Sequence, residues 1–283
     1  MFSKFSRSWQ LVKASASVLR QDKALLVFPA VSSLAALLVA ITFIVPMVLM
    51  VPLTEVISED ESVSIGFWIW LFVFYLTQYF VMFFFNTALV GAAMIRLEGG
   101  QPTLGAGLQV ALSRVGAIFI YAVMAATVGL ILRMIEQRLG FIGRMVVGLI
   151  GLAWTVATFL VVPVLVTRNV SAVEAVKEST GLLKKTWGEN LIGQGGIGLA
   201  FGFIQAGLIF ATVTLAALAG MVGGLVLAIT VLVAGVLAVL MAALIQTALS
   251  AIYAAALYRF ATGQPNPEAF DAGLLQDAFQ VKA

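Results

Sequence analysis

Six long apolar runs, separated by short polar segments, dominate the hydropathy pattern of the chain. About 20 consecutive apolar residues are enough for a helix to cross the hydrocarbon core of a membrane. The pattern predicts six transmembrane spans, at residues 24–53, 65–95, 115–132, 145–167, 191–219 and 225–257. We therefore expect one membrane domain over residues 1–260, followed by a cytoplasmic tail of residues 261–283.

A different pattern precedes every second span. Residues 2–20, 103–114 and 171–187 are predicted to form short surface helices, and Ser171 with Glu174 fits a capping box at the start of the third. In the first and third helices, apolar residues recur every three or four positions and basic residues lie off that face, as in helices that lie in a headgroup region. These basic residues are Lys4, Arg7, Lys13, Arg20, Lys177, Lys184 and Lys185. For residues 2–20, a cap packed on the bundle is the alternative.

These patterns together predict an all-α polytopic membrane bundle. Its six transmembrane helices form three hairpins, and an amphipathic cytoplasmic surface helix precedes each hairpin. A faint match between residues 12–20 and residues 176–184 is consistent with a repeated unit.

The composition agrees with a membrane protein and narrows the possible chemistry. Hydrophobic residues make up 62% of the chain and charged residues 10%, and the mean hydropathy is +1.09. Ordinary globular domains carry about 25% charged residues. The chain contains no cysteine and no histidine, which excludes disulfides, thiolate nucleophiles, the usual zinc and haem ligands and the commonest general base. We expect no catalytic residue, no metal, no cofactor and no nucleic-acid partner.

The distribution of basic residues predicts the orientation in the membrane. Of the 16 lysines and arginines, all but Arg133, Arg138 and Arg144 fall in segments expected on the same side as the termini. The positive-inside rule then places both termini in the cytoplasm. The opposite side also carries an acidic loop, residues 54–64. This loop lacks the ligand spacing and the glycine of a dedicated calcium loop, so we expect a solvated connection.

A cluster of charged side chains marks the predicted turn between the third and fourth spans. It comprises Arg133, Glu136, Arg138 and Arg144. Arg133 and Glu136 are three residues apart, so they can pair along one helix face, and Arg144 can reach the same acid from the opposing helix. Two interpretations are open: an ion-paired clasp that fixes the hairpin, or an outward-facing site for an anion or a lipid headgroup that uses the guanidinium groups.

Four amides lie inside the predicted spans: Gln78, Asn86, Gln205 and Gln246. They either form hydrogen bonds between helices or line a polar path. Gly198 and Gly202 form a G-x-x-x-G pair, which permits close helix packing within one protomer or between protomers. No carboxylate lies in mid-membrane and no discontinuous helix pair is expected, which disfavours a proton-coupled transporter.

Residues 5–29, 126–144 and 161–193 resemble an uncharacterised family of bacterial and archaeal membrane proteins, classed as a domain of unknown function. The last stretch is also similar to membrane domains that precede some glycerophosphodiester phosphodiesterases. In those domains a span ends in a short polar break and an EA-x-x-x-S helix follows, here Glu174-Ala175 and Ser179. Arg168 stands where such breaks often carry an acid. The resemblance implies six spans and the inner membrane of a prokaryote, but no established activity.

The sequence leaves two functions open. The first is a non-catalytic membrane protein that organises lipid, through anionic headgroups, or partner proteins, including a second copy of itself. The second is a channel or transporter for a small solute, with a polar path between the helices.

Overall fold

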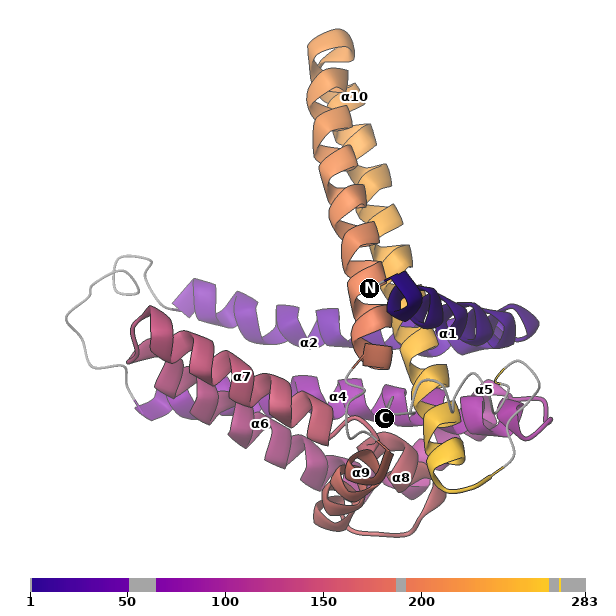
Figure 1. The fold of residues 1–283 in the computed structure, drawn as a ribbon. Helices are drawn as coiled ribbons and strands as arrows, with labels where there is room; N and C mark the ends of the chain where they lie inside the picture. Colours follow the sequence, from indigo (N-terminus) through magenta and orange to yellow (C-terminus); the bar gives the residue numbers. More distant parts are fainter. Residues whose placement is uncertain (1, 51–64, 187–191, 265–269, 271–283) are drawn as a thin grey trace. The chain divides into compact units, whose positions relative to one another are not determined.

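The computed structural model describes residues 2–50, 65–186, 192–264 and 270 (Figure 1). Every secondary-structure element in this part of the chain is a helix. The elements are α1 (Phe2–Gln21), the 3-10 helix η1 (Lys23–Leu26), α2 (Val27–Met50), α4 (Ile65–Leu97), α5 (Leu104–Ser113), α6 (Val115–Gln137), α7 (Phe141–Ala157), α8 (Val161–Thr167), α9 (Ala172–Thr186) and α10 (Ile192–Ala261). The acidic loop and nearly all of the predicted tail lie outside the described residues.

The chain divides into two compact units, although the pattern of spans predicts a single domain. The α6–α7 unit comprises Val27–Ala92 and Pro102–Lys185, and the α10 unit comprises Met1–Leu26, Ala93–Gln101 and Thr186–Ala283. Helix α4 runs from one unit into the other. Each unit is described by itself.

In the α6–α7 unit, α2 packs against α4 through aromatic rings and one amide. Phe43 of α2 lies 5.9 Å from Trp70 and 5.5 Å from Phe74, measured between ring centroids. Gln78 of α4 donates a hydrogen bond to the backbone carbonyl of Ala36, at 3.0 Å. This is the interhelical role expected for a membrane amide, because a polar group in hydrocarbon is stabilised by a partner on a neighbouring helix.

Helices α6 and α7 lie side by side as an antiparallel hairpin (Figure 1). Both helices continue beyond the predicted spans, which end at residue 132 and begin at residue 145. Arg133 and Glu136 are in α6 itself, and Arg144 is in α7. Arginine, glutamate and glutamine are good helix formers, so α6 continues past Leu132.

The predicted fourth span is broken into α7 and α8, which corrects the expectation of continuous helices. Pro163 has no N–H to donate to the carbonyl of Phe159, four residues back, and its ring crowds that carbonyl. The broken turn, residues 158–160, is bonded to α9 instead. Ser179 donates to the carbonyl of Ala157 at 2.7 Å and accepts from the N–H of Leu160 at 3.1 Å. The Ser179 side chain is fully buried, so this contact supplies partners that water cannot.

In the α10 unit, α1 packs against α10. Val12, Val18 and Leu19 of α1 are buried, whereas Lys13 and Arg20 are exposed. The apolar face is therefore covered by protein, as in the packed-cap alternative, and the basic residues face outward. The side chains of Lys4 and Arg7 lie outside the described part.

Two arginines hold the helix ends of this unit together. Arg259, whose side chain is 6% exposed, forms an ion pair with Glu98 at 2.8 Å. Arg96 donates to the side chain of Gln21 at 2.7 Å. These bonds join the end of α4 to the ends of α10 and α1.

Helix α10 consists of two arms that fold back on each other at Gly224 (Figure 1). Gly224 has φ +71°, a conformation that glycine adopts without strain, so the predicted glycine turn is confirmed here. Gln205 and Gln246 bond across the arms at 2.9 Å. Gly235 lets the two arms pack closely, because a Cβ there would lie 2.1 Å from the side chain of Thr212.

Among the described residues, five helical segments are long and apolar enough to cross a membrane, and the last of them contains the reversal at Gly224. A Cβ added at Gly198 or at Gly202 would meet nothing within 4 Å in the described part of the chain. The close packing within the protomer that the G-x-x-x-G pair suggested is therefore found at Gly235.

Candidate functional site

A pocket of about 310 Å³ lies between α4, α6 and α7 in the α6–α7 unit. Its polar lining consists of Tyr75 and Tyr79 from α4 and Arg133 and Glu136 from α6. Its apolar lining consists of Gly129, Leu132, Val147 and Gly148. We call this cavity the tip pocket. Its volume lies within the range of about 300–1,000 Å³ that is usual for small-molecule sites.

Two glycines, Gly129 and Gly148, line the tip pocket. A Cβ on Gly129 would lie 3.3 Å from the hydroxyl of Tyr79, so the glycine lets the tyrosine lie close against α6. A Cβ on Gly148 would meet nothing within 4 Å. A larger side chain at Gly148 would therefore extend into open space beside the pocket.

Arg133 has a partner that the sequence did not suggest. Its Nη1 donates a hydrogen bond to the hydroxyl of Tyr75, at 2.9 Å. Within the described ranges, ion pairs join Arg168 to Glu178 and Arg259 to Glu98, and neither pair includes Arg133 or Glu136. The expected ion pairs of Glu136 with Arg133 and with Arg144 are therefore absent from this part of the chain. Arg133 carries a full positive charge bonded to a neutral phenol, in the same pocket as a carboxylate.

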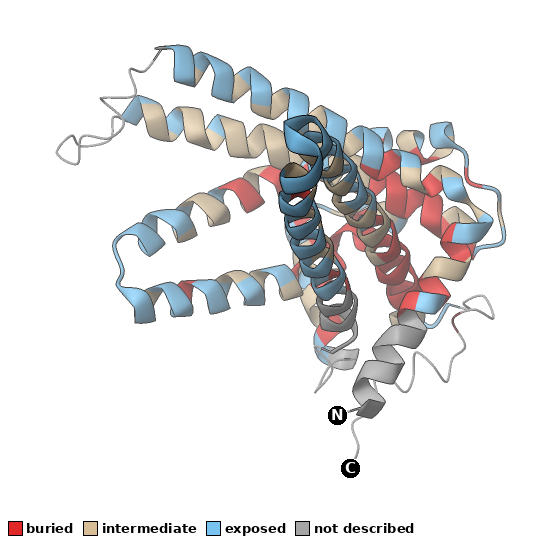
Figure 2. Cartoon of the chain, turned by 90° about the horizontal axis from the view of Figure 1, so that it is seen from above, coloured by how far each residue is buried: buried red, intermediate tan, exposed pale blue. Residues whose placement is uncertain are grey.

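Arg138 and Arg144 were predicted as members of the same cluster, but they do not line the tip pocket. Both are exposed at the end of the α6–α7 hairpin, where Figure 2 shows mostly exposed residues. Arg138 is the C-terminal cap of α6. All four predicted charges are exposed, but only Arg133 and Glu136 line the tip pocket.

The two tyrosines were not singled out from the sequence as site residues. Tyr75, Tyr79 and Phe83 are each four residues apart on α4, so they share one helix face. Their rings stack in sequence, and Phe83 stacks on Tyr121 of α6 with centroids 4.4 Å apart. This spacing was the available signal, because it predicts an aromatic stripe facing a neighbouring helix.

The amides predicted inside the spans lie elsewhere. Gln78, Gln205 and Gln246 are engaged in the interhelical bonds described above. Asn86 is half-buried in α4. None of these amides lines the tip pocket.

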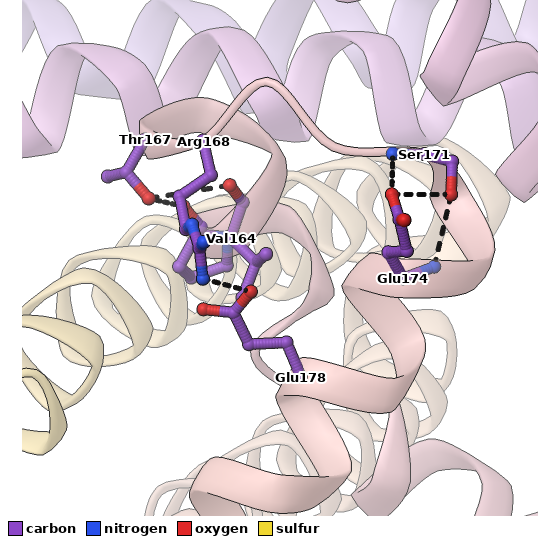
Figure 3. Close-up of polar contacts among 7 residues, drawn as sticks. Val164, Thr167, Arg168, Ser171, Glu174 and Glu178 are labelled. Carbon is purple, nitrogen blue, oxygen red and sulfur yellow. Dashed lines mark hydrogen bonds and ion pairs between the residues drawn. The ribbon is translucent and has the colours of Figure 1, made fainter.

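A second polar cluster joins α8 to α9 (Figure 3). Arg168, directly after α8, forms an ion pair with Glu178 of α9 at 2.7 Å. Asn169 accepts a hydrogen bond from Arg114, at the junction of α5 and α6. The cluster therefore fixes how the broken span continues into α9.

The predicted capping box at the start of α9 is confirmed. The backbone N–H and the hydroxyl of Ser171 both donate to the carboxylate of Glu174, each at 2.9 Å, and the Glu174 N–H donates to the Ser171 hydroxyl at 3.3 Å (Figure 3). The backbone bond and then the hydroxyl bond from Ser171 lower the pKa of Glu174. Further along α9, Lys177 and Lys184 are exposed, and the side chain of Lys185 lies outside the described part.

The helices and their apolar surfaces indicate a helical membrane protein with several spans. The sequence also identifies the family of the protein. The chain belongs to a family of unknown function, DUF6159, whose profile matches residues 63–266. A comparison with curated proteins finds no match.

Proposed function

We propose that this protein is a non-catalytic integral membrane protein that organises lipid, and that the tip pocket binds the phosphate of a headgroup. The supporting observation is Arg133, a guanidinium that lines a cavity and is bonded to a neutral tyrosine. Arginine binds phosphate with short, charge-assisted and frequently bidentate hydrogen bonds. One of its donors holds Tyr75, and the remaining donors are available to a ligand.

The depth of the tip pocket suits a lipid headgroup. Arg133 lies four residues before the end of α6, which is about 6 Å along the axis. We propose that six spans form three hairpins, that the termini are cytoplasmic and that this turn is at the outer surface of a prokaryotic inner membrane. Arg133 would then lie at headgroup level, where tyrosine is enriched. Leu132 and Val147 would meet the glycerol region.

The exposed basic residues on α1 and α9 support the same role on the opposite side. Lys13, Arg20, Lys177 and Lys184 point away from the protein. Each lysine or arginine near an anionic membrane surface contributes about 1 kcal/mol of attraction. The alternative, a path for a small solute, has less support because three of the four span amides are engaged in bonds between helices.

The proposal predicts that Arg133→Gln removes most of the bound phospholipid. Arg138→Gln is the matched control, because it removes an exposed arginine from the same turn without changing the pocket. Loss of a charge-assisted hydrogen bond costs about 1.5–3 kcal/mol, so affinity is expected to fall at least about tenfold. Binding is measured by native mass spectrometry of the purified protein titrated with a dioleoyl phospholipid.

Two further arms make this experiment decisive. Gly148→Leu fills space beside the pocket without changing a charge and is also expected to weaken lipid binding. Inorganic phosphate in the same titration separates the two sources of the phosphate group: competition by phosphate at low millimolar concentration would assign the site to the free anion. Equal lipid binding by Arg133→Gln and Arg138→Gln would overturn the proposal.

A further inference from the structure

The tip pocket carries two side chains of opposite charge that do not form an ion pair with each other. Arg133 and Glu136 both line it, three residues apart on α6. Residues at this spacing have Cβ atoms about 5–6 Å apart on one face of a helix. Their side chains would normally pair, yet in the described part of the chain no ion pair joins them, and Arg133 turns to Tyr75. The pocket therefore carries a guanidinium and a carboxylate that are not paired with each other.

From this arrangement we infer that the tip pocket selects a zwitterionic headgroup with a primary ammonium, of the phosphoethanolamine type. This inference rests on the proposed headgroup site and specifies its ligand. The phosphate lies at Arg133, and the ammonium, which a two-carbon bridge separates from the phosphate, lies at Glu136. A primary ammonium has three N–H donors, so it can donate to the Glu136 carboxylate and balance its charge by itself.

The aromatic lining agrees with a cationic group in the ligand. Tyr75 and Tyr79 stack with their centroids 6.3 Å apart, and both line the pocket. The face of an aromatic ring attracts a cation within about 6 Å of its centroid. A purely anionic headgroup makes favourable contact with Arg133 alone, and its charge is repelled by Glu136. The Glu136 carboxylate thus discriminates between headgroups that share the same phosphate.

The size of the preference follows from the exposure of Glu136. This side chain is exposed, and ion pairs in contact with solvent contribute at most a factor of about five in affinity. We expect the wild-type protein to retain dioleoyl phosphatidylethanolamine about fivefold over dioleoyl phosphatidylglycerol. Phosphatidylcholine, which has no N–H donor, is expected to be retained less than phosphatidylethanolamine.

The test uses full-length protein in nanodiscs that contain the three dioleoyl lipids in equal amounts. Lipids that remain bound after detergent extraction are quantified by mass spectrometry for the wild type, Glu136→Gln, Arg133→Gln and Arg138→Gln. Glu136→Gln is expected to lower the ethanolamine-to-glycerol ratio to about one. Arg138→Gln is expected to match the wild type. Because Glu136 and Arg138 are both exposed, neither substitution is expected to unfold the protein.

The outcomes separate this inference from the proposed function. An unchanged ratio in Glu136→Gln, or equal retention of phosphatidylcholine and phosphatidylethanolamine by the wild type, would overturn the ammonium assignment and leave the phosphate site intact. Unchanged total lipid in Arg133→Gln would overturn the phosphate site and the selectivity with it. Lipid loss in Arg133→Gln together with a ratio of one in Glu136→Gln supports both.

Discussion

At the scale of single residues, the charged side chains of this protein act mainly at helix ends. Glu174 accepts two bonds from Ser171, Arg168 pairs with Glu178, and Arg259 pairs with Glu98. The first two contacts join α9 to the chain just before it, and the third joins the ends of α4 and α10. Arg133 differs, because its guanidinium donates a hydrogen bond to the Tyr75 hydroxyl, with no carboxylate of the described residues paired to it, and lines a cavity. This difference is why we assign ligand binding to Arg133 and structural roles to the others.

The capping box at Glu174 gives a prediction about pH. Because the pKa of Glu174 is lower in the folded chain than in the unfolded chain, its contribution to α9 is complete above the unfolded pKa of about 4.3. That contribution is lost as the pH falls through the lower, folded pKa. Hydrogen exchange of the first turn of α9 is therefore expected to show less protection at pH 3 than at pH 6. Ser171→Ala is expected to weaken protection at pH 6 and to reduce the pH dependence; an undiminished pH dependence in this variant would contradict the assignment.

At the scale of elements, the broken span α7–α8 depends on a side chain of a third helix. Ser179 bonds both edges of the break from α9, and it is fully buried. Removing its hydroxyl leaves one backbone donor and one acceptor to find new partners. The break is therefore a joint between the hairpin and α9, and Ser179 is the side chain that bonds both of its edges.

We predict that Ser179→Ala lowers the free energy of unfolding by about 1–3 kcal/mol, the cost of leaving buried polar groups unpaired. Ser113→Ala is the control, because its hydroxyl bonds an exposed carbonyl one turn back and its loss is expected to change stability by less than about 0.5 kcal/mol. Denaturant unfolding in detergent, followed by circular dichroism, measures the difference. Equal stability of the two variants would show that the joint does not need the serine.

These elements show which features the sequence could predict. The capping box involves residues three apart, so local pattern was sufficient. The bond between Arg133 and Tyr75 joins residues 58 apart, and it depends on which helices are neighbours. The sequence therefore identified the charges of the tip pocket but gave them the wrong partners. The break between α7 and α8 was not predicted, and its bonds come from Ser179, a residue of another helix.

At the scale of the whole molecule, the order of elements follows the predicted pattern of one short helix and then two apolar segments. Helix α1 precedes α2 and α4, α5 precedes α6 and the α7–α8 segment, and α9 precedes the two arms of α10. The reversal at Gly224 makes α10 the length of two spans. We propose on this basis that both termini and the three short helices face the cytoplasm.

This orientation can be tested with single cysteines, because the natural chain has none. Gly140 lies in the exposed turn between α6 and α7, and Gln101 lies in the exposed connection before α5. We predict that Gly140→Cys reacts with a membrane-impermeant maleimide in intact spheroplasts, and that Gln101→Cys reacts only after permeabilisation. The reverse pattern would place the tip pocket on the cytoplasmic side.

The central claim is that the tip pocket holds the phosphate of a phospholipid, and an experimental structure in a lipid nanodisc tests it most directly. We predict lipid density with its phosphate within hydrogen-bond distance of the Arg133 guanidinium and its glycerol region beside Leu132 and Val147. A tip pocket that contains only water, with solute density in mid-membrane beside Gln78 and Asn86, would contradict the claim and favour transport.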